Sequence, residues 1–244
     1  MSKTVLITGA SRGIGRAALI ELSRRGYNVI GVCLNNKEEL LKATEEAASF
    51  GVKALGIPNL NVGDYEQCKA GIYDYIHDRK ISADYIVNNA GISHIGLLQD
   101  MSPEEWSSII AVNLSSVFNI CKLFIPDMLK KGCGKIINIS SVWGNTGASC
   151  EVAYSAAKGG INSFTRALAK ELAPSDIQVN AIAFGAIDTE MNNHLSSEEK
   201  HMLEGEIPMG RMGTAEEAAK LIADTIEMPK YVTGQIITMD GGWT

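Results

Sequence analysis

The chain has 244 residues, of which 45% are hydrophobic and 20% charged, with a formal net charge of −6. These values indicate a soluble globular protein with a sizeable core, and they argue against nucleic acid or an anionic membrane as the main partner. The 5 cysteines form no CxxC pair and no metal-like cluster, so we expect free thiols in a reducing, cytoplasmic setting and no metal site.

Short apolar runs alternate with longer helical patterns along the chain. The alternation predicts an α/β fold with a parallel sheet, in a single domain over residues 1–244. The expected strands are residues 5–7, 29–32, 54–57, 85–87, 136–139, 179–182 and 236–239. The expected helices are residues 14–25, 38–50, 65–79, 104–131, 154–172 and 215–226. Residues 183–212 are expected to be irregular, as a mobile lid over a site, and no run reaches membrane length.

A glycine-rich segment, residues 8–15, joins the first expected strand to the first expected helix. Glycines let the backbone turn sharply and approach a phosphate, and a helix N-terminus supplies unpaired N–H groups. The spacing Gly-x-x-x-Gly-x-Gly differs from the Gly-x-Gly-x-x-Gly fingerprint of many dinucleotide-binding domains. The segment predicts a phosphate-binding turn, with an ordinary turn between strand and helix as the alternative.

Tyr154 and Lys158 stand four residues apart in an Ala-rich run, which places a phenol and an ammonium on one face of a helix. A cation beside a phenol stabilises the phenolate and lowers a pKa that is about 10 in the free side chain. The pair is therefore a candidate acid/base device. On the spacing alone, a packed ring and a solvated amine are the alternative.

Four elements then occur in order: the glycine-rich turn, Asn88-Asn89-Ala90-Gly91, Ser141, and Tyr154 with Lys158. With this ordered set, the chain resembles the short-chain dehydrogenase/reductase family over essentially its whole length. The resemblance implies a Rossmann-like, doubly wound parallel sheet of about seven strands, flanked by helices on both faces. It also implies an oxidoreductase that transfers a hydride between a nicotinamide and a ketone or secondary alcohol.

The resemblance implies a role for each catalytic residue. Tyr154 resembles the general acid that protonates the carbonyl oxygen, and Lys158 resembles the residue that lowers its pKa and holds the nicotinamide ribose. Ser141 resembles the hydroxyl that orients the substrate oxygen. Ser140 is the competing hydroxyl, but the separation of Ser141 from Tyr154 matches the family. Asn113 resembles the helix residue that holds a water in a proton relay.

The expected cofactor is NADP, with NAD less favoured. Arg12 lies where NADP-binding members often have a basic residue, and residues 32–37 offer no carboxylate to a ribose 2′-OH. Asn61 with Val62 is the nearest match to the family's adenine-contacting turn, and residues 59–60 are the rival register. The expected cofactor contacts are Gly9, Ser11, Arg12, Gly13, Ile14, Gly15, Asn61, Val62, Asn89, Ala90, Gly91, Tyr154, Lys158, Gly185, Ile187 and Thr189. Phe184 replaces a family proline, and it either packs in the core or shapes the site.

The substrate is the least specified feature. Residues 207–213 and 234–242 resemble 3-oxoacyl-[acyl-carrier-protein] reductases, although an arginine common in the turn after the Tyr154 helix is missing. Lys130, Lys131 and Lys135 either form a basic rim or are simply solvated. Residues 143–152 resemble a bacterial branch proposed to reduce a 5-aminopentanone group on elongation factor P. Glu151 would then receive a substrate ammonium, with a dipole-favoured helix acid as the alternative. The expected substrate-mouth residues are His94, Trp143 and Glu151.

The expected partners follow from the same resemblance. They are a ketone or acyl-thioester substrate, free or carried on a protein, with no nucleic acid and no membrane. Apolar helices at residues 104–131 and 154–172 are expected to pair in a homotetramer. A cofactor-sensing regulatory protein on the same fold is the alternative from another class. Such a protein would tolerate loss of Tyr154 or Lys158, and both residues are present.

Overall fold

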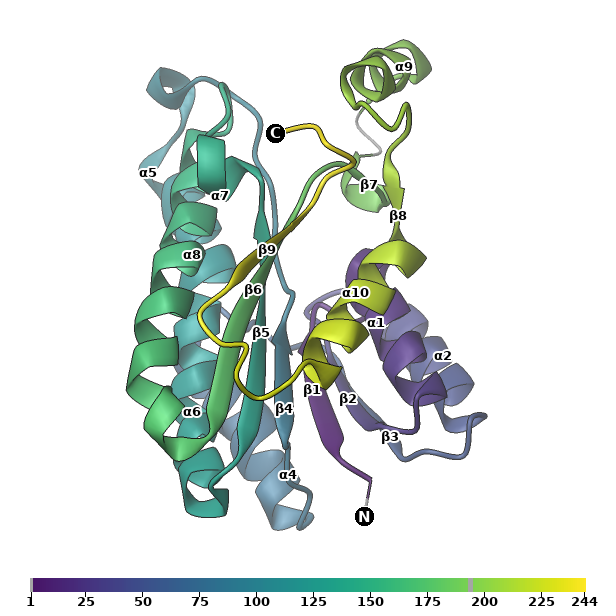
Figure 1. Cartoon of the computed structure of the whole chain (residues 1–244), viewed down its shortest axis with the longest axis vertical. Coiled ribbons are helices and arrows are strands. Elements are labelled where there is room, and N and C mark those ends of the chain that lie inside the picture. The colour runs from purple at the N-terminus through teal and green to yellow at the C-terminus, as the bar shows by residue number, and fades with distance from the viewer. Residues whose placement is uncertain (1, 193–194) are drawn as a thin grey trace.

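The structure, a computed structural model, describes residues 2–192 and 195–244. Its centre is a 7-stranded sheet in the order β3-β2-β1-β4-β5-β6-β9, with every neighbouring pair parallel (Figure 1). The order reverses between β1 and β4, the place where ligands bind in such sheets. The strands are β1 (Thr4–Thr8), β2 (Asn28–Val32), β3 (Ala54–Ile57), β4 (Tyr85–Asn88), β5 (Gly134–Ser141), β6 (Ile177–Phe184) and β9 (Ile236–Met239). The doubly wound sheet expected from the sequence is thus confirmed.

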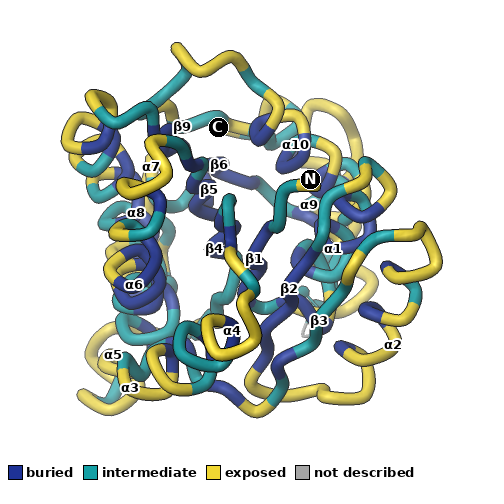
Figure 2. Tube along the Cα trace, turned by 90° about the horizontal axis from the view of Figure 1, so that it is seen from below, coloured by how far each residue is buried: buried dark blue, intermediate teal, exposed yellow. Residues whose placement is uncertain are grey.

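Helices cover both faces of this sheet, so its strands are buried on two sides (Figures 1 and 2). Alternate residues of one strand enter opposite layers: Val5 and Ile7 pack in one core and Leu6 packs in the other. The first core is covered by α1 (Gly13–Arg24), α2 (Lys37–Ala48) and α10 (Ala215–Glu227). The second is covered by α3 (Tyr65–Cys68), α4 (Tyr75–Asp78), α6 (Ser116–Lys131) and α8 (Val152–Leu172).

The expected helix over residues 104–131 is interrupted. It begins as α5 (Pro103–Ile110), where Ser102 and Glu105 form a capping box, and it continues as α6 after a π-helical segment, Ala111–Ser115. Pro103–Lys131 is long and apolar enough to cross a membrane by length and composition, which the sequence reading had not expected. However, 50% of its most apolar window is buried inside the molecule, so this helix is weak evidence for a membrane span.

Residues 183–212 are more regular than expected. Ala183 and Phe184 complete β6, β7 (Ile187–Asp188) pairs with β8 (Gly213–Thr214), and α9 (Ser197–Glu206) follows a capping box at Ser196. The expectation of an irregular stretch is therefore wrong, except that residues 193 and 194 lie outside the described chain. None of the α9 residues is buried, so no apolar stripe signalled the helix, and its cap and charged helix formers specify it instead.

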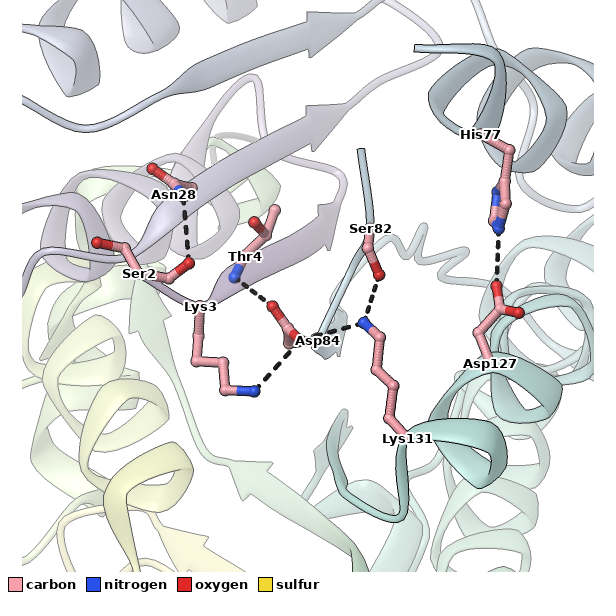
Figure 3. Close-up of polar contacts among 9 residues, drawn as sticks. All are labelled: Ser2, Lys3, Thr4, Asn28, His77, Ser82, Asp84, Asp127 and Lys131. Atoms are coloured by element: carbon pink, nitrogen blue, oxygen red, sulfur yellow. Dashed lines mark hydrogen bonds and ion pairs between the residues drawn. The ribbon is translucent and has the colours of Figure 1, made fainter. Parts of the chain in front are cut away.

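At the amino ends of the strands, ion pairs and a hydrogen bond around Asp84 join neighbouring elements. The Asp84 carboxylate accepts from the Thr4 amide at 3.0 Å, and it lies 3.4 Å from Lys3 Nζ and 3.1 Å from Lys131 Nζ (Figure 3). These contacts join β1, the start of β4 and the end of α6. Lys3 and Lys131 therefore make structural contacts at the amino ends of the strands, the end of the sheet opposite to the carboxyl ends.

Candidate active site

A cavity of about 710 Å³ opens where the strand order reverses. Its walls come from the segments that follow six strands of the sheet, together with α8, α9 and the C-terminal tail. The predicted site residues that line it are Gly9, Ser11, Arg12, Gly13, Ile14, Gly15, Asn61, Val62, Asn89, Ala90, Gly91, Ser141, Trp143, Glu151, Tyr154, Lys158, Gly185, Ile187 and Thr189. Residues separated by up to 180 positions in the sequence thus share one cavity.

The glycine-rich turn is built for close packing and leaves a helix N-terminus open to the cavity. Gly9 and Gly13 have positive φ values of 67° and 51°. A Cβ on Gly15 would lie 2.2 Å from the Gly9 carbonyl oxygen, so only glycine fits there. Arg12 caps α1 without a side-chain hydrogen bond, and the first turn holds no acid. Unpaired N–H groups at a helix N-terminus suit a phosphate group. One carboxylate is nearby, since Glu190 Oε2 would lie 3.6 Å from a Cβ on Gly13.

The segment after β4 is fastened to that turn by two side chains. Asn89 Nδ2 donates to the Thr8 carbonyl at 2.9 Å and to the Gly9 carbonyl at 3.2 Å. Thr8 Oγ1 accepts from the backbone amides of Asn89 and Ala90, each at 3.0 Å. Thr8 was not singled out from the sequence, although a hydroxyl at the end of a buried strand was the available signal. These bonds fix the two cofactor-side motifs relative to one another.

Arg12 and residues 33–36 line the same cavity, and none of residues 33–36 is acidic. Leu60, Asn61 and Val62 also line it, whereas Asn59 is not among the described lining residues, which favours the expected register over its rival. Asn61 Oδ1 already accepts from the Gly63 amide at 2.9 Å. One lone pair of that amide oxygen is left for an adenine amino group.

Lys158 is 3% exposed, and its Nζ donates to the Ile139 carbonyl at 2.8 Å. Burial lowers the pKa of this ammonium to about 8. Nζ lies 5.4 Å from the centre of the Tyr154 ring. Burial raises the pKa of Tyr154, the Glu151 carboxylate raises it further, and a hydrogen bond with Ser141 lowers it. The expected lowering of the phenol's pKa is therefore wrong for this structure, because burial disfavours the phenolate and the Glu151 carboxylate acts in the same direction.

The two neighbouring serines have different partners. Ser141 Oγ is hydrogen-bonded with the Tyr154 hydroxyl and accepts from the Trp143 amide at 3.2 Å. Ser140 Oγ donates to Asn162 Oδ1 at 2.7 Å and lies 3.3 Å from the Lys158 carbonyl oxygen. Ser141 is thus the hydroxyl beside the phenol, while Ser140 links β5 to α8. This arrangement favours Ser141 for substrate contact.

Asn162 extends this link to a short helix, α7 (Trp143–Thr146), which the sequence did not predict. Asn162 Nδ2 donates to Asn145 Oδ1 at 2.9 Å. A Cβ on Gly144 would lie 2.7 Å from the Lys158 carbonyl carbon, so α7 packs directly on the α8 backbone. Residues 140, 162 and 145 carry no catalytic spacing pattern, and only the tertiary structure brings them together.

Asn113 lies behind the cavity wall, in the π-helical segment Ala111–Ser115, and is 0% exposed. Its Nδ2 donates to the carbonyls of Ile92 at 2.8 Å and Ile109 at 3.0 Å. Within residues 2–192 and 195–244, its Oδ1 is one of the buried oxygens without a hydrogen-bond partner. A Cβ on Gly91 would lie 2.8 Å from this oxygen and 3.6 Å from Lys158 Nζ, so both polar groups border Gly91. Functional sites often use such a π-helical segment to aim a side chain inward.

Phe184 meets both expectations, because it is 4% exposed within the core and also lines the cavity. Gly185 cannot carry a side chain here, since a Cβ would lie 2.7 Å from Asp240 Cβ at the end of β9. Close approach of β6 and β9 therefore requires glycine after Phe184. The cavity wall at this point is set by strand packing.

The substrate end differs from expectation in several places. Glu151 lines the cavity as the N-cap residue of α8, just outside the helix on which it was expected. His94 is not among the described residues of the lining, and its Nδ1 lies 3.8 Å from Glu105 Oε1. Trp243 lines the cavity and was missed, because the final residues of a chain carry no spacing signal. Its ring centre lies 4.9 Å from that of Trp143.

The expected basic rim is absent from the described part of this mouth. Lys131 contacts Asp84, Lys130 lies 3.6 Å from Asp127, and Lys135 donates to the Met228 carbonyl at 2.6 Å. All three lysines flank the start of β5, whereas the cavity lies at the carboxyl ends of the strands. Of the two alternatives left open for these lysines, the basic rim is therefore excluded, because they lie at the opposite end of the strands.

A family model described as short chain dehydrogenase matches residues 3–200. Together with the 7-stranded parallel sheet and the cavity at its switch point, this match places the chain in the short chain dehydrogenase family of oxidoreductases. The resemblance seen in the sequence is thus confirmed.

Individual relatives carry different activities. The chain is 40% identical to the uncharacterized oxidoreductase YmfI of Bacillus subtilis, over 100% of this chain and 99% of that protein. It is also 40% identical to the 3-oxoacyl-[acyl-carrier-protein] reductase FabG of Staphylococcus aureus, over 99% and 98% of the two chains. Acetoin dehydrogenase YohF from Salmonella typhimurium has a similar structure, with a TM-score of 0.90 and 33% identity over 100% and 96% of the two chains.

Proposed function

We propose that the protein is an NADPH-dependent ketone reductase that acts on a 3-oxoacyl thioester. The observation that carries this proposal is the joining of Ser141, Tyr154 and Lys158 with the open N-terminus of α1 in one cavity. Similarity to a 3-oxoacyl-[acyl-carrier-protein] reductase over nearly the whole chain supports the substrate class. Because such thioesters are borne by an acyl carrier protein in that relative, a carrier-bound substrate is part of the proposal.

The residues present fit NADP. The N-terminus of α1 would hold the pyrophosphate, Arg12 the 2′-phosphate and Lys158 the nicotinamide ribose. When bound, the nicotinamide supplies the hydride. The unpartnered Asn113 oxygen and the Lys158 ammonium border Gly91, which suits a polar relay behind the cofactor site.

Ser141 and Tyr154 supply the substrate hydrogen bond and the proton that reduction of the ketone requires. Ser141 holds the substrate oxygen by a hydrogen bond while Tyr154 donates its phenolic proton to it. A phenol whose pKa is raised by burial stays protonated at neutral pH, so Tyr154 is set to act as an acid.

The second candidate, reduction of a 5-aminopentanone group on elongation factor P, is favoured by Glu151. This carboxylate lines the cavity and lies close enough to Tyr154 to raise its pKa. A carboxylate at that place would pair with a substrate ammonium. The lysines expected to contact an acidic carrier protein lie at the other edge of the sheet. The third candidate, a cofactor sensor, gives no reason for Tyr154 and Lys158 to share the cavity.

The test is NADPH oxidation by the purified protein with an acetoacetyl thioester, a 5-amino-2-ketone and a neutral ketone of equal length. Turnover of the thioester in preference to both ketones supports the proposal. Glu151→Gln keeps the shape of the side chain and removes its charge. A selective rise in KM for the amino-ketone in this variant would support the second candidate instead. Cofactor binding without turnover of any ketone would leave only the sensor.

A further inference from the structure

The C-terminal tail reaches the candidate active site and is held there by a carboxylate. After β9, Asp240 Oδ1 accepts from the Gly242 amide at 2.9 Å, and Oδ2 accepts from the Thr244 amide at 2.9 Å and from Thr244 Oγ1 at 3.0 Å. Gly241 and Gly242 take positive φ values of 68° and 84°. The tail is therefore a defined turn at the same end of the sheet as α7 (Figure 1).

A second contact fixes the tail against the segment that follows α9. The Met209 amide donates to the Gly241 carbonyl at 3.2 Å. A Cβ on Gly241 would lie 2.9 Å from Ile207 Cγ2, so the Gly241 backbone packs directly against the Ile207 side chain. Trp243 leaves this turn and extends its side chain into the cavity lining.

Two indoles meet at this point. Trp143 follows Ser141 by two positions, and its ring centre lies 4.9 Å from that of Trp243, with an angle of 61° between the planes. Such an edge-to-face pair is a favourable arrangement of aromatic rings. Both indoles line the cavity that also holds Ser141 and Tyr154. Trp143 is itself anchored, because α7 packs on α8 through Gly144 and is bonded to Asn162 through Asn145.

We infer that Trp243 is a specificity-determining residue, which forms with Trp143 an apolar wall for the arm of the substrate beyond its ketone. Ser141 and Tyr154 hold the carbonyl oxygen, so a small ketone engages these two groups alone. A ketone with an extended arm also buries that arm against the indoles. The wall thus selects extended ketones over small ones. This inference rests on the proposed function, since the position of the ketone comes from it.

The experiment compares Trp243→Ala with the unaltered protein and with Trp106→Ala. Trp106 is 38% exposed on α5 and is not among the described residues of the lining, so it is the matched control. Binding of an acetoacetyl-N-acetylcysteamine thioester is measured by calorimetry with NADP⁺ present. KM is measured for that thioester and for butane-2,3-dione. We expect Trp243→Ala to raise the thioester's Kd and KM about tenfold. The KM for the dione should stay within about twofold of that of the unaltered protein.

The controls separate the possible failures. Trp106→Ala should leave the thioester's Kd and the KM of both ketones within about twofold of their unaltered values. Trp243→Phe, which keeps a ring, should retain most of the thioester affinity. If Trp243→Ala does not fold, Trp243→Leu carries the same comparison. Equal losses on both ketones, no loss on either, or no thioester binding by the unaltered protein overturns the inference. Binding that depends on Trp243 without turnover of any ketone upholds the inference and overturns the proposed function.

Discussion

At the scale of single residues, burial controls the protonation of the groups that carry the chemistry. It lowers the pKa of Lys158 to about 8, and it raises that of Tyr154. Lys158 therefore remains mostly an ammonium at neutral pH, and Tyr154 remains a phenol. The Ser141 hydroxyl is hydrogen-bonded with that phenol, so both groups are placed together in the cavity.

Removing the phenolic hydroxyl tests this role directly. In Tyr154→Phe, we expect steady-state turnover with NADPH to fall at least about 100-fold, because the proposed proton donor is removed. Cofactor affinity, measured by fluorescence titration, should change less than about twofold. Tyr231 is 100% exposed, so Tyr231→Phe is the matched control and should keep full activity. Near-normal turnover of Tyr154→Phe would contradict the assigned role.

Arg12 provides a test of cofactor choice. Its removal in Arg12→Ala deletes a charge-assisted contact to a 2′-phosphate. The binding free energy of NADPH should therefore weaken by about 1.5–3 kcal/mol, with a smaller change for NADH. Arg16, on α1, lies 2.7 Å from Glu46 in a surface ion pair. Arg16→Ala should therefore lower the free energy of unfolding by no more than about 1 kcal/mol and leave the affinities for NADPH and NADH unchanged. Equal affinity of the unaltered protein for both cofactors would refute NADP selectivity.

Lys158 also links function to stability. Its folded-state pKa of about 8 lies below the ordinary lysine pKa of 10.5, so the unfolded chain binds more protons between these values. This group therefore destabilises the fold fully below about pH 8, and the penalty is relieved as the pH rises toward 10.5. Lys158→Met should raise the urea-measured free energy of unfolding at pH 7 by about 1–3 kcal/mol while abolishing turnover. A less stable variant would show that the ammonium stabilises the fold.

At the scale of elements, the active site depends on how α7 sits on α8. The contact is made by backbone, with Gly144 against the Lys158 peptide, and by the side chains of Asn145 and Asn162. The same short helix carries Trp143 and begins two residues after Ser141. Displacing α7 would therefore move the substrate wall and the hydroxyl together, without touching either side chain.

Gly144→Ala tests this packing. The added Cβ would lie 2.7 Å from the Lys158 carbonyl carbon, and the resulting overpacking should lower the free energy of unfolding by about 1–3 kcal/mol and reduce kcat. Gly159→Ala is the control from the facing helix, because its Cβ would meet nothing closer than the Gly144 oxygen at 3.5 Å. That variant should be tolerated, and alanine is the better helix former. Equal behaviour of the two variants would argue against a tight α7–α8 contact.

At the scale of the whole molecule, the layer formed by α5, α6 and α8 exposes several large apolar side chains. Phe118 is 49% exposed, Leu129 45% and Val152 40% on the layer formed by α5, α6 and α8. Ile109 and Val117, within the same apolar stretch of residues 104–131, are instead buried inside the chain at 3% and 2% exposure. We propose that the exposed residues pair across a two-fold axis in a homotetramer.

Light scattering tests this assembly. The unaltered protein should be a tetramer at micromolar concentration, and Phe118→Asp should give smaller species, because a carboxylate would be buried at the interface. Leu41, on α2 in the opposite layer, is 39% exposed, so Leu41→Asp should leave the assembly intact. A monomeric unaltered protein would refute the proposal.

Local pattern was enough to predict the sheet and the motifs. Apolar runs alternating with helical segments predicted each of the seven strands of the sheet, because inner strands such as β1 and β6 are almost wholly buried and contain short apolar runs. The glycine-rich turn, Asn89, Ser141, Tyr154 and Lys158 occur in the order typical of the family, which the family model confirms. The strands and the motifs are each formed by residues close together in the sequence, so the sequence alone is enough to recognise them.

Only the tertiary structure decided how distant segments meet. It placed Lys131 at the edge opposite the cavity, paired His94 with Glu105, and brought Trp243 onto Trp143 across 100 positions. It also reversed the expected direction of the Tyr154 pKa shift. Side-chain partners and desolvation depend on contacts between residues far apart in the chain, and a linear pattern contains no record of them.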